Sequence, residues 1–235
     1  MSSQVFKDRI LNDLLPEFCD DPARCYDIAG FRHNFAQVDG VDADNFLKGL
    51  DAGLVKLVGR LYRAPRSGAG EQFFWSGGKN LMPRPTTIWV EPIITVATLW
   101  KLHDDLGWPK DLLGTQSGDG AFDVMAYVDM ASKSEYIACE VKKTTKELDS
   151  LIRTMRKFAA LPVDAAASDR EKNAFKKIVA LRKRRPPLFW AVGPGGNSLA
   201  FKLSYSDDGL IALDEALILD LRYPPSPVAR LNEAN

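Results

Sequence analysis

Three charged residues in the middle of the chain have the types and spacing of a catalytic site. Asp123 lies in residues 118–128 (GDGAFDVMAYV), and Glu140 and Lys142 lie in residues 136–143 (YIACEVKK). Both runs are otherwise apolar and rich in strand-forming residues, so they predict two strands joined by a polar segment. Side chains alternate across a strand, which places Glu140 and Lys142 on one face. A hairpin would bring Asp123 beside Glu140, so we expect two carboxylates and one ammonium to converge at the edge of a small sheet.

Such a cluster could bind a divalent cation and activate water. Carboxylates are hard oxygen ligands that suit Mg²⁺, with Mn²⁺ as a substitute. A lysine beside them can orient or deprotonate the attacking water and offset negative charge at a phosphorus atom. A Glu-x-Lys triplet on a strand is also common as a solvated charge pair. However, charges in an otherwise apolar strand are expected to be paired or to bind metal, which favours a site.

This pattern resembles the signature of the PD-(D/E)XK nuclease superfamily, an acidic residue on one strand followed by Glu/Asp-x-Lys on the next. Here the signature is Asp123 followed by Glu140-Val141-Lys142, with Phe122 where the family often has proline. The resemblance covers roughly residues 86–193. It implies an α/β (α+β) fold with a restriction-endonuclease-like core, in which a central mixed β-sheet is flanked by helices. It also implies that Asp123 and Glu140 bind Mg²⁺ and that Lys142 is catalytic.

The same resemblance implies a further acidic ligand and an activity. Helices before the catalytic hairpin of this superfamily often supply another carboxylate, and Glu91 is the candidate, although a glutamate at a helix N-terminus also suits the helix dipole. We therefore expect a Mg²⁺-dependent endonuclease that hydrolyses double-stranded DNA in restriction or defence, with repair or recombination as the next setting and a homodimer as one option. Two alternatives stay open: a non-catalytic nucleic-acid-binding or assembly module, and an α/β enzyme for a small phosphorylated substrate.

The distribution of charge favours a nucleic-acid partner, although the net charge is zero. Residues 141–186 contain 14 Lys/Arg and 5 Asp/Glu, whereas residues 1–50 contain 5 Lys/Arg and 9 Asp/Glu. A basic segment directly after the site is where a phosphate backbone would bind, so we expect Lys143, Lys146 and Arg153 to contact DNA. The alternative is a solvated lysine-rich helix face.

Two further stretches are candidates for DNA contact. Gln116 and Ser117 belong to the glycine-rich stretch before Asp123, and such a stretch suits a backbone close to a ligand, here the scissile phosphate. Residues 64–80 combine glycine, aromatic and basic residues, which predicts phosphate contacts by Arg66 and Lys79. A short hairpin whose aromatic side chains pack on the core is the alternative for this segment.

Periodicity and breakers predict the elements around the site. We expect an N-terminal helical extension over residues 1–85, a nuclease-like core over 86–223 and a tail over 224–235. The expected helices are 5–15, ended by Pro16; about 42–61; 86–106, capped by Thr86 or Thr87; 144–161; and 169–185, capped by Asp169. Pro92 disturbs a first helical turn, so Glu91 or Pro92 is the alternative start of the third of these helices. The expected later strands are 188–192 and a hairpin over 198–213.

Composition narrows the class of protein. The chain lacks a run of about 18 apolar residues, and its first 15 residues carry charges, so we expect neither a membrane span nor a secretory signal. Three cysteines fit a reducing cytoplasm better than a disulfide framework. Only two histidines are present, which argues against a structural zinc site.

Overall fold

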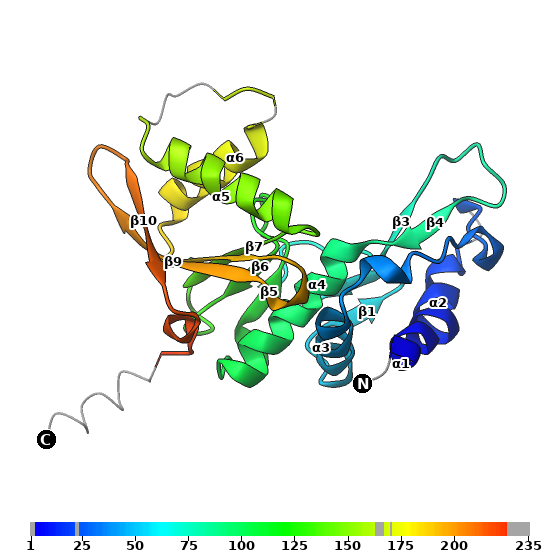
Figure 1. Ribbon diagram of the computed structural model, residues 1–235. Coiled ribbons are helices and arrows are strands. Elements are labelled where there is room, and N and C mark those ends of the chain that lie inside the picture. The colour runs from blue at the N-terminus through cyan, green and yellow to red at the C-terminus, as the bar shows by residue number, and fades with distance from the viewer. Residues whose placement is uncertain (1–2, 22–23, 163–166, 170, 225–235) are drawn as a thin grey trace, which may run out of the picture.

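A mixed six-stranded β-sheet flanked by helices forms the centre of the protein (Figure 1). The structure, a computed structural model, describes residues 3–21, 24–162, 167–169 and 171–224. The strand order is β10-β9-β8-β7-β6-β5, and only β7 and β8 are parallel neighbours. The strands are β5 (Leu113–Thr115), β6 (Val124–Ala126), β7 (Ile137–Val141), β8 (Leu188–Val192), β9 (Ser198–Tyr205) and β10 (Ile211–Ala216). The expected mixed sheet, the strand 188–192 and the final hairpin are thereby confirmed.

The two central strands are buried on both faces, as their apolar sequences require. Every residue of β7 and β8 is buried. On one face, Ala138 and Phe189 pack against helices α5 (Thr145–Ala159) and α6 (Lys172–Arg184). On the other face, Cys139 and Trp190 belong to the core that includes helix α4 (Val90–Trp100). The site residues on β7 therefore lie between two layers of helices.

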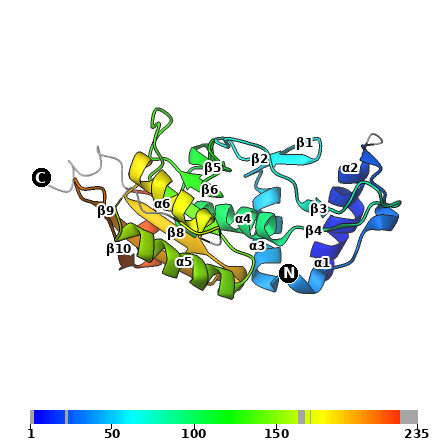
Figure 2. The ribbon, with the colours of Figure 1, turned by 90° about the horizontal axis from the view of Figure 1, so that it is seen from above.

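The N-terminal elements pack on the α4 side of the sheet. Figure 2 shows α1, α2 and the β3–β4 hairpin at one end of an elongated molecule and α5, α6, β9 and β10 at the other, with α3 and α4 between them. Side chains of α3 such as Phe46 share one hydrophobic core with α4 and the sheet. The N-terminal elements are α1 (Ser3–Asp8), a π-helical turn (Arg9–Leu14), α2 (Leu15–Cys19), α3 (Gly40–Asp51), β1 (Lys56–Val58), β2 (Leu61–Arg63), β3 (Phe74–Ser76) and β4 (Thr86–Ile88).

The second helix is shorter than its apolar pattern predicts. It begins after Asp39, whose side chain accepts a hydrogen bond from Val41 N, and it ends at Asp51 rather than near residue 61. Gly53 and Gly59 follow with positive φ angles of 67° and 57°, a conformation that ends a helix. The apolar residues after Gly53 therefore form the β1–β2 hairpin, and the predicted helical extension to residue 61 is wrong.

Three other helix boundaries also differ from the expectation. The first helix continues past Pro16 to Cys19, because Pro16 lies in the first turn of α2, where its missing N–H is not needed. Residues 86–88 form strand β4, so α4 starts at Val90 without a threonine cap, one residue before the alternative start at Glu91. Helix α6 starts at Lys172 and not after Asp169. By contrast, α5 begins after Thr144, whose hydroxyl accepts a hydrogen bond from Glu147 N, as expected.

The strand that carries the first acidic residue is also shorter than predicted. Only Val124–Ala126 is extended, and residues 117–121 form a turn before it. β5 pairs with β6 and was not expected, because its three residues, Leu113–Thr115, are too few to show a period.

The predicted domain boundary after residue 85 does not separate two structural units. Residue 85 falls inside the β3–β4 hairpin, because β3 pairs with β4 across it. Residues 225–235 of the predicted tail lie outside the described residues. Among the described helices, none combines the length and apolarity that crossing a membrane would need.

Candidate active site

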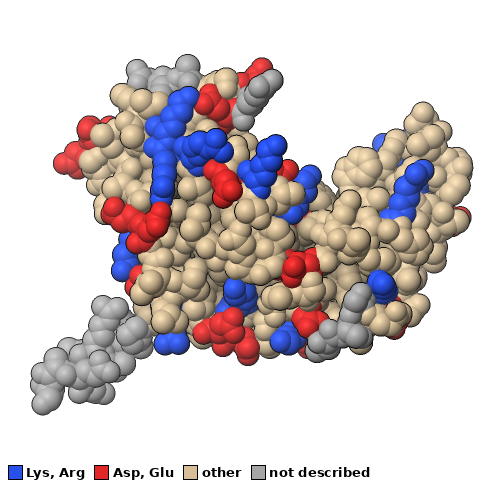
Figure 3. All heavy atoms as spheres, viewed as in Figure 1, with Lys and Arg blue, Asp and Glu red and all other residues tan. Residues whose placement is uncertain are grey.

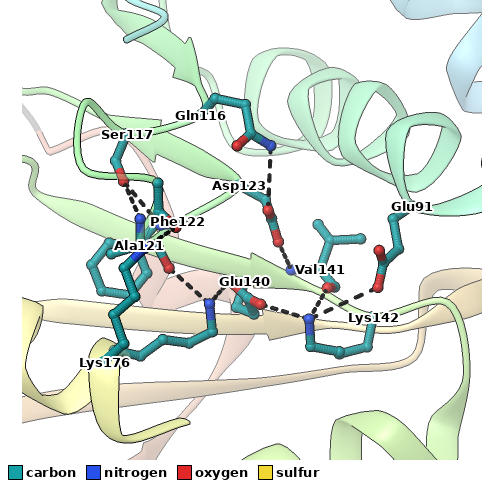
Figure 4. Close-up of polar contacts among 12 residues, drawn as sticks. Glu91, Gln116, Ser117, Ala121, Phe122, Asp123, Glu140, Val141, Lys142 and Lys176 are labelled. Atoms are coloured by element: carbon teal, nitrogen blue, oxygen red, sulfur yellow. Dashed lines mark hydrogen bonds and ion pairs between the residues drawn. The ribbon is translucent and has the colours of Figure 1, made fainter. Parts of the chain in front are cut away.

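Asp123 and Glu140 are brought together by the β6–β7 hairpin, as the sequence predicts. Val124 pairs with Cys139, so Asp123 lies directly before β6 and next to Glu140 on the neighbouring strand. Asp123 N donates to Cys139 O at 3.0 Å, and Asp123 Oδ2 accepts from Val141 N at 2.8 Å (Figure 4). The backbone of β7 therefore fixes the orientation of the Asp123 carboxylate.

Glu140 is a buried carboxylate held between two lysines. Its side chain is 2% exposed, with Lys142 Nζ 2.6 Å from Oε1 and Lys177 Nζ 2.6 Å from Oε2. Burial raises the pKa of Glu140 to about 7, and the charge of Asp123 adds to the rise, whereas the two ammonium groups oppose it. The same group can therefore be a carboxylate or a carboxylic acid near neutral pH.

The Lys142 ammonium lies among three oxygen atoms. Its Nζ is 2.6 Å from Glu140 Oε1, 3.0 Å from the carbonyl oxygen of Val141 and 3.8 Å from Glu91 Oε1 (Figure 4). Burial lowers the pKa of Lys142, but Glu140, Asp123 and Glu91 outweigh burial and raise it. Lys142 therefore stays positively charged in this structure.

Glu91 reaches the same cluster from the first turn of α4. Burial raises the pKa of Glu91, the Lys142 charge lowers it, and Asp123 raises it again. Glu91 and Lys142 also line an open pocket of about 370 Å³, which is bounded by α5 and α6 through residues such as Ser150, Thr154 and Asn173. The four residues predicted to form the site thus lie together, beside a pocket with polar walls.

Lys177 is a site residue that the sequence analysis did not identify. It comes from α6, is 3% exposed, and donates a hydrogen bond to Ala121 O at 2.8 Å while it pairs with Glu140. It therefore links β7 to the turn that precedes Asp123. One signal was present, because Lys177 lies on the same helical face as the buried residues Ala174 and Leu181. A lysine on an apolar stripe indicates a buried partner.

Glu71 is a second carboxyl group that the sequence did not indicate. Its Oε2 accepts a hydrogen bond from the hydroxyl of Tyr62, which is fully buried. Burial raises the pKa of Glu71 to about 7; hydrogen bonds from Tyr62 and Gln116 lower it, and the charges of Asp123 and Glu91 raise it. The segment around Glu71 is distinguished by its glycine, aromatic and basic residues, and nothing in that pattern singles out this glutamate.

The two predicted phosphate contacts before Asp123 have different surroundings. Gln116 has a positive φ of 51°, which is uncommon for a residue with a side chain, and its Nε2 donates to Asp123 Oδ1 at 3.4 Å. Ser117 is buried, and its hydroxyl accepts from Ala121 N and Phe122 N at 2.9 Å each. In this structure Ser117 therefore stabilises the turn, whereas Gln116 faces the carboxylate.

The predicted DNA-contacting cations lie in three places. Lys143 directly follows Lys142 and is exposed, and Lys146 and Arg153 are exposed along α5. Lys79 is exposed in the β3–β4 loop. The guanidinium of Arg66 instead donates to the carbonyl oxygens of residues 129 and 132 and lies 3.7 Å above the ring of Tyr127.

The ligand atoms fit a divalent cation in their chemistry. In the described part of the chain, no three His, Cys, Asp or Glu side chains lie close enough together to hold a metal ion. However, the carboxylates of Asp123 and Glu140 and the carbonyl oxygen of Val141 are hard oxygen donors, which Mg²⁺ prefers together with several waters. The Lys142 ammonium already occupies a position among such oxygens.

The site as a whole draws on four parts of the chain. Asp123 comes from the residue before β6, Glu140 from β7 and Glu91 from α4 (Figure 4). Lys177 comes from α6. The turn at residues 117–121 and the Tyr62–Glu71 pair complete its surroundings. Comparison with known proteins finds no matching family model, no matching curated protein and no matching solved structure.

Proposed function

We propose that this protein is a metal-dependent endonuclease with a restriction-endonuclease-like core that hydrolyses phosphodiester bonds in double-stranded DNA. One observation carries the proposal: Asp123, directly before β6, lies beside the Glu140-x-Lys142 triplet at the end of β7, and Glu91 faces Lys142. This is the arrangement that the resemblance to the PD-(D/E)XK superfamily implies. Restriction or defence is the setting that we favour.

Asp123, Glu140 and Glu91 are the residues that would hold Mg²⁺. Mn²⁺, a similar hard cation, would substitute. When bound, the ion would polarise a phosphate oxygen and lower the pKa of a coordinated water. Of the two Glu140 oxygens, Oε1 faces Lys142 and Oε2 faces the buried Lys177. Oε1 is therefore the oxygen that is available from the open side of the site.

Lys142 would act on the reacting groups directly. Its raised pKa keeps it protonated, so it can donate hydrogen bonds to a phosphate oxygen or orient the attacking water. Glu140 anchors it at 2.6 Å, and the Val141 carbonyl fixes its direction at 3.0 Å. A charged donor held in place before substrate arrives costs no reorganisation during the reaction.

The surface around the site supports DNA as the substrate. Figure 3 shows Lys and Arg side chains, with Asp and Glu side chains among them, over the lobe that contains α5 and α6, and the surface is hollowed between this lobe and the β3–β4 hairpin. Lys143 and Lys146 lie at the start of α5, directly after the catalytic strand. Because phosphate contacts of this kind release counterions, DNA affinity should fall steeply with salt concentration.

Plasmid cleavage tests the proposal. Supercoiled DNA is incubated with the protein and Mg²⁺, Mn²⁺ or EDTA, and the Asp123→Asn and Lys142→Met variants are compared with Asp214→Asn and Lys133→Met, which change exposed residues outside the site. We expect metal-dependent nicking or linearisation that falls at least about 100-fold in the two site variants. Equal rates in the site and control variants would contradict the assignment.

A second candidate is a DNA-binding or assembly module that does not cut. Two lysines neutralise Glu140, and no three acidic side chains converge in the described residues, which is the observation that favours it. Tight, salt-sensitive DNA binding without cleavage in either metal would support the module. If the protein does not bind DNA, the remaining hypothesis is an enzyme that acts on a small phosphorylated substrate.

A further inference from the structure

The loop between β3 and β4 presents an apolar tip to solvent. It projects from the N-terminal end of the molecule (Figure 1). Within this tip, defined as residues 78–83, the side chains of Met82 and Leu81 are 74% and 49% exposed, and Lys79 is exposed beside them. Two large neighbouring apolar side chains at the end of a projecting hairpin are poorly explained by folding, because they bury no core surface.

The base of the tip is held in place by polar and stacking contacts. Arg84 is 8% exposed, its Nε donates to Gly77 O at 2.7 Å, and its guanidinium lies 5.1 Å above the ring of Tyr26. Gly77 N donates to Pro85 O at 2.8 Å. A Cβ at Gly30 would collide with the carbonyl oxygen of Arg84, so this glycine allows the close approach. The tip is therefore presented by an ordered base.

The two segments that form and contact the tip carry basic residues. Residues 72–90 together with residues 28–38, which contact them through the Phe31–Thr86 bridge, contain three Lys/Arg and no Asp or Glu. Arg32 and Lys79 are exposed, whereas Arg84 is buried at the base of the tip. The acidic residues at this end of the molecule lie in other segments, such as Asp8 of α1, Glu17 of α2 and Asp27, whose carboxylate accepts a hydrogen bond from Ala29 N. Apolar residues flanked by exposed cations complement a polyanion better than an average protein surface does.

The tip is also within reach of DNA that occupies the candidate site. β4 leads into α4, and Met82 and Glu91 are separated by nine positions, so at about 3.3 Å per residue they are at most roughly 30 Å apart. One turn of B-DNA is about 34 Å. Both could therefore contact one duplex within a single turn.

We propose that the hairpin tip inserts Leu81 or Met82 between two base pairs from the minor groove, while Lys79 and Arg32 contact the flanking phosphates. Leucine and methionine are among the side chains that wedge into base steps, and such insertion bends the duplex. This inference rests on DNA being the partner in the proposed function. The bend would increase the contact between the duplex and the basic lobe formed by α5 and α6.

Base unstacking tests the proposal. Duplexes with 2-aminopurine at successive positions are titrated with the Asp123→Asn protein, which binds without cutting. We expect fluorescence to rise at one base step within about nine base pairs of the cleavage position. The Leu81→Ala/Met82→Ala variant should lose this rise and bind about tenfold more weakly. Leu217→Ala/Leu219→Ala, which removes two exposed leucines elsewhere, should change neither.

The other outcomes distinguish the proposed insertion of the tip into DNA from the proposed nuclease activity. Metal-dependent cleavage with no fluorescence change at any position would overturn the wedge and leave the nuclease standing. A fluorescence rise that depends on Leu81 and Met82 in a protein that never cuts would support the wedge and contradict the nuclease. The Leu81→Ala/Met82→Ala variant could instead lose self-association in sedimentation while its DNA affinity and 2-aminopurine fluorescence stay unchanged. The tip would then contact another protein molecule, and the proposed insertion into DNA would be wrong.

Discussion

Glu140 lies between two ammonium groups, those of Lys142 and Lys177. Lys142 approaches one oxygen from the open side, whereas Lys177 approaches the other from the buried face of α6. A buried charge pair that loses one partner leaves the other charge uncompensated, which costs far more than losing an exposed pair. The two lysines should therefore respond differently to substitution.

Replacing Lys177 should destabilise the fold. At pH 8, Lys177→Met leaves Glu140 with one of its two counter-charges, so we expect a loss of about 3–5 kcal/mol in the free energy of unfolding. The loss should shrink at pH 5.5, because Glu140 can then take up a proton. Urea unfolding at both pH values measures it. Lys183→Met, which changes an exposed lysine of the same helix, should stay within about 0.5 kcal/mol; equal losses for both variants would contradict the buried pair.

Glu71 should make stability depend on pH. Its pKa is raised from 4.5 to about 7, so between these values the folded state keeps a proton that the unfolded state releases. Stability therefore falls as the pH rises from about 4.5 to 7, by up to roughly 3 kcal/mol from this group. Glu71→Gln cannot ionise and should lose less stability over this range in urea unfolding. Parallel pH profiles for wild type and Glu71→Gln would refute the assignment; Glu215→Gln is the exposed control.

For single residues, the sequence could predict which side chains of the site lie on one strand or on two neighbouring strands. Asp123, Glu140 and Lys142 were found because strand alternation and a hairpin relate them directly, and Glu91 because of the family resemblance. Lys177 and Glu71 could not be found in this way. Their partners are distant in the chain, and the packing of α6 on the sheet and of residues 62–71 beside the site is a tertiary property.

Among the elements, helix α6 has a second role beyond covering the sheet. Its lysines donate to the turn before Asp123: Lys176 to Gly120 O at 3.2 Å and Lys177 to Ala121 O at 2.8 Å. At the end of the helix, Arg184 pairs with Asp119 and with the buried Glu135, the latter at 2.7 Å. α6 thereby fixes the turn that positions the first acidic residue.

Removing Arg184 should loosen this turn. Arg184→Met leaves Glu135 buried without its cation, so we expect a loss of about 3–5 kcal/mol in the free energy of unfolding. Adding Glu135→Leu should recover part of it, and the double-mutant cycle measures the coupling. Hydrogen exchange at Ala121 and Phe122, whose amides donate to Ser117, should accelerate in Arg184→Met more than elsewhere. Uniform acceleration across the protein would argue against a local role.

The elements that the sequence predicted well are those with a clear start and stop. α5 has a threonine cap and a regular apolar stripe, and β8 is a continuous apolar run before a glycine. The second helix was misjudged because Leu54, Leu57 and Leu61 continue a helical spacing, while Gly53 ends the helix through its backbone conformation. Short strands such as β5 depend on neighbours that a local pattern does not contain.

The whole molecule shares one hydrophobic core between its N-terminal part and the sheet. Phe46 and Leu47 of α3 belong to the same cluster as Ile93 of α4 and Trp190 of β8. Asp42 adds a polar link, because its buried carboxylate accepts a hydrogen bond from Gly195 N at 2.7 Å. The N-terminal residues therefore support the sheet as well as carrying the β3–β4 hairpin.

This shared core predicts that residues 86–235 do not fold alone. Without α3, the apolar face of α4 would be exposed to water, at a cost of roughly 1.5–3 kcal/mol for each large side chain. A fragment of residues 86–235 should show no cooperative thermal unfolding by circular dichroism. As a control, the same measurement is made after residues 1–85 are added as a separate chain. A sharp, reversible transition in the fragment alone would favour the independent core that the sequence analysis expected.

The strand order also has a consequence for self-association. β5 is bordered by residues 66–68, whose amides donate to Leu113 O and Thr115 O, so one margin of the sheet is already paired. At the other margin, β10 carries exposed Asp214 and Glu215. Two copies that joined their sheets through β10 would bring these like charges together, which natural proteins use to prevent such pairing. Growth of a continuous intermolecular sheet is therefore disfavoured at neutral pH, and the protein should resist aggregation by that route.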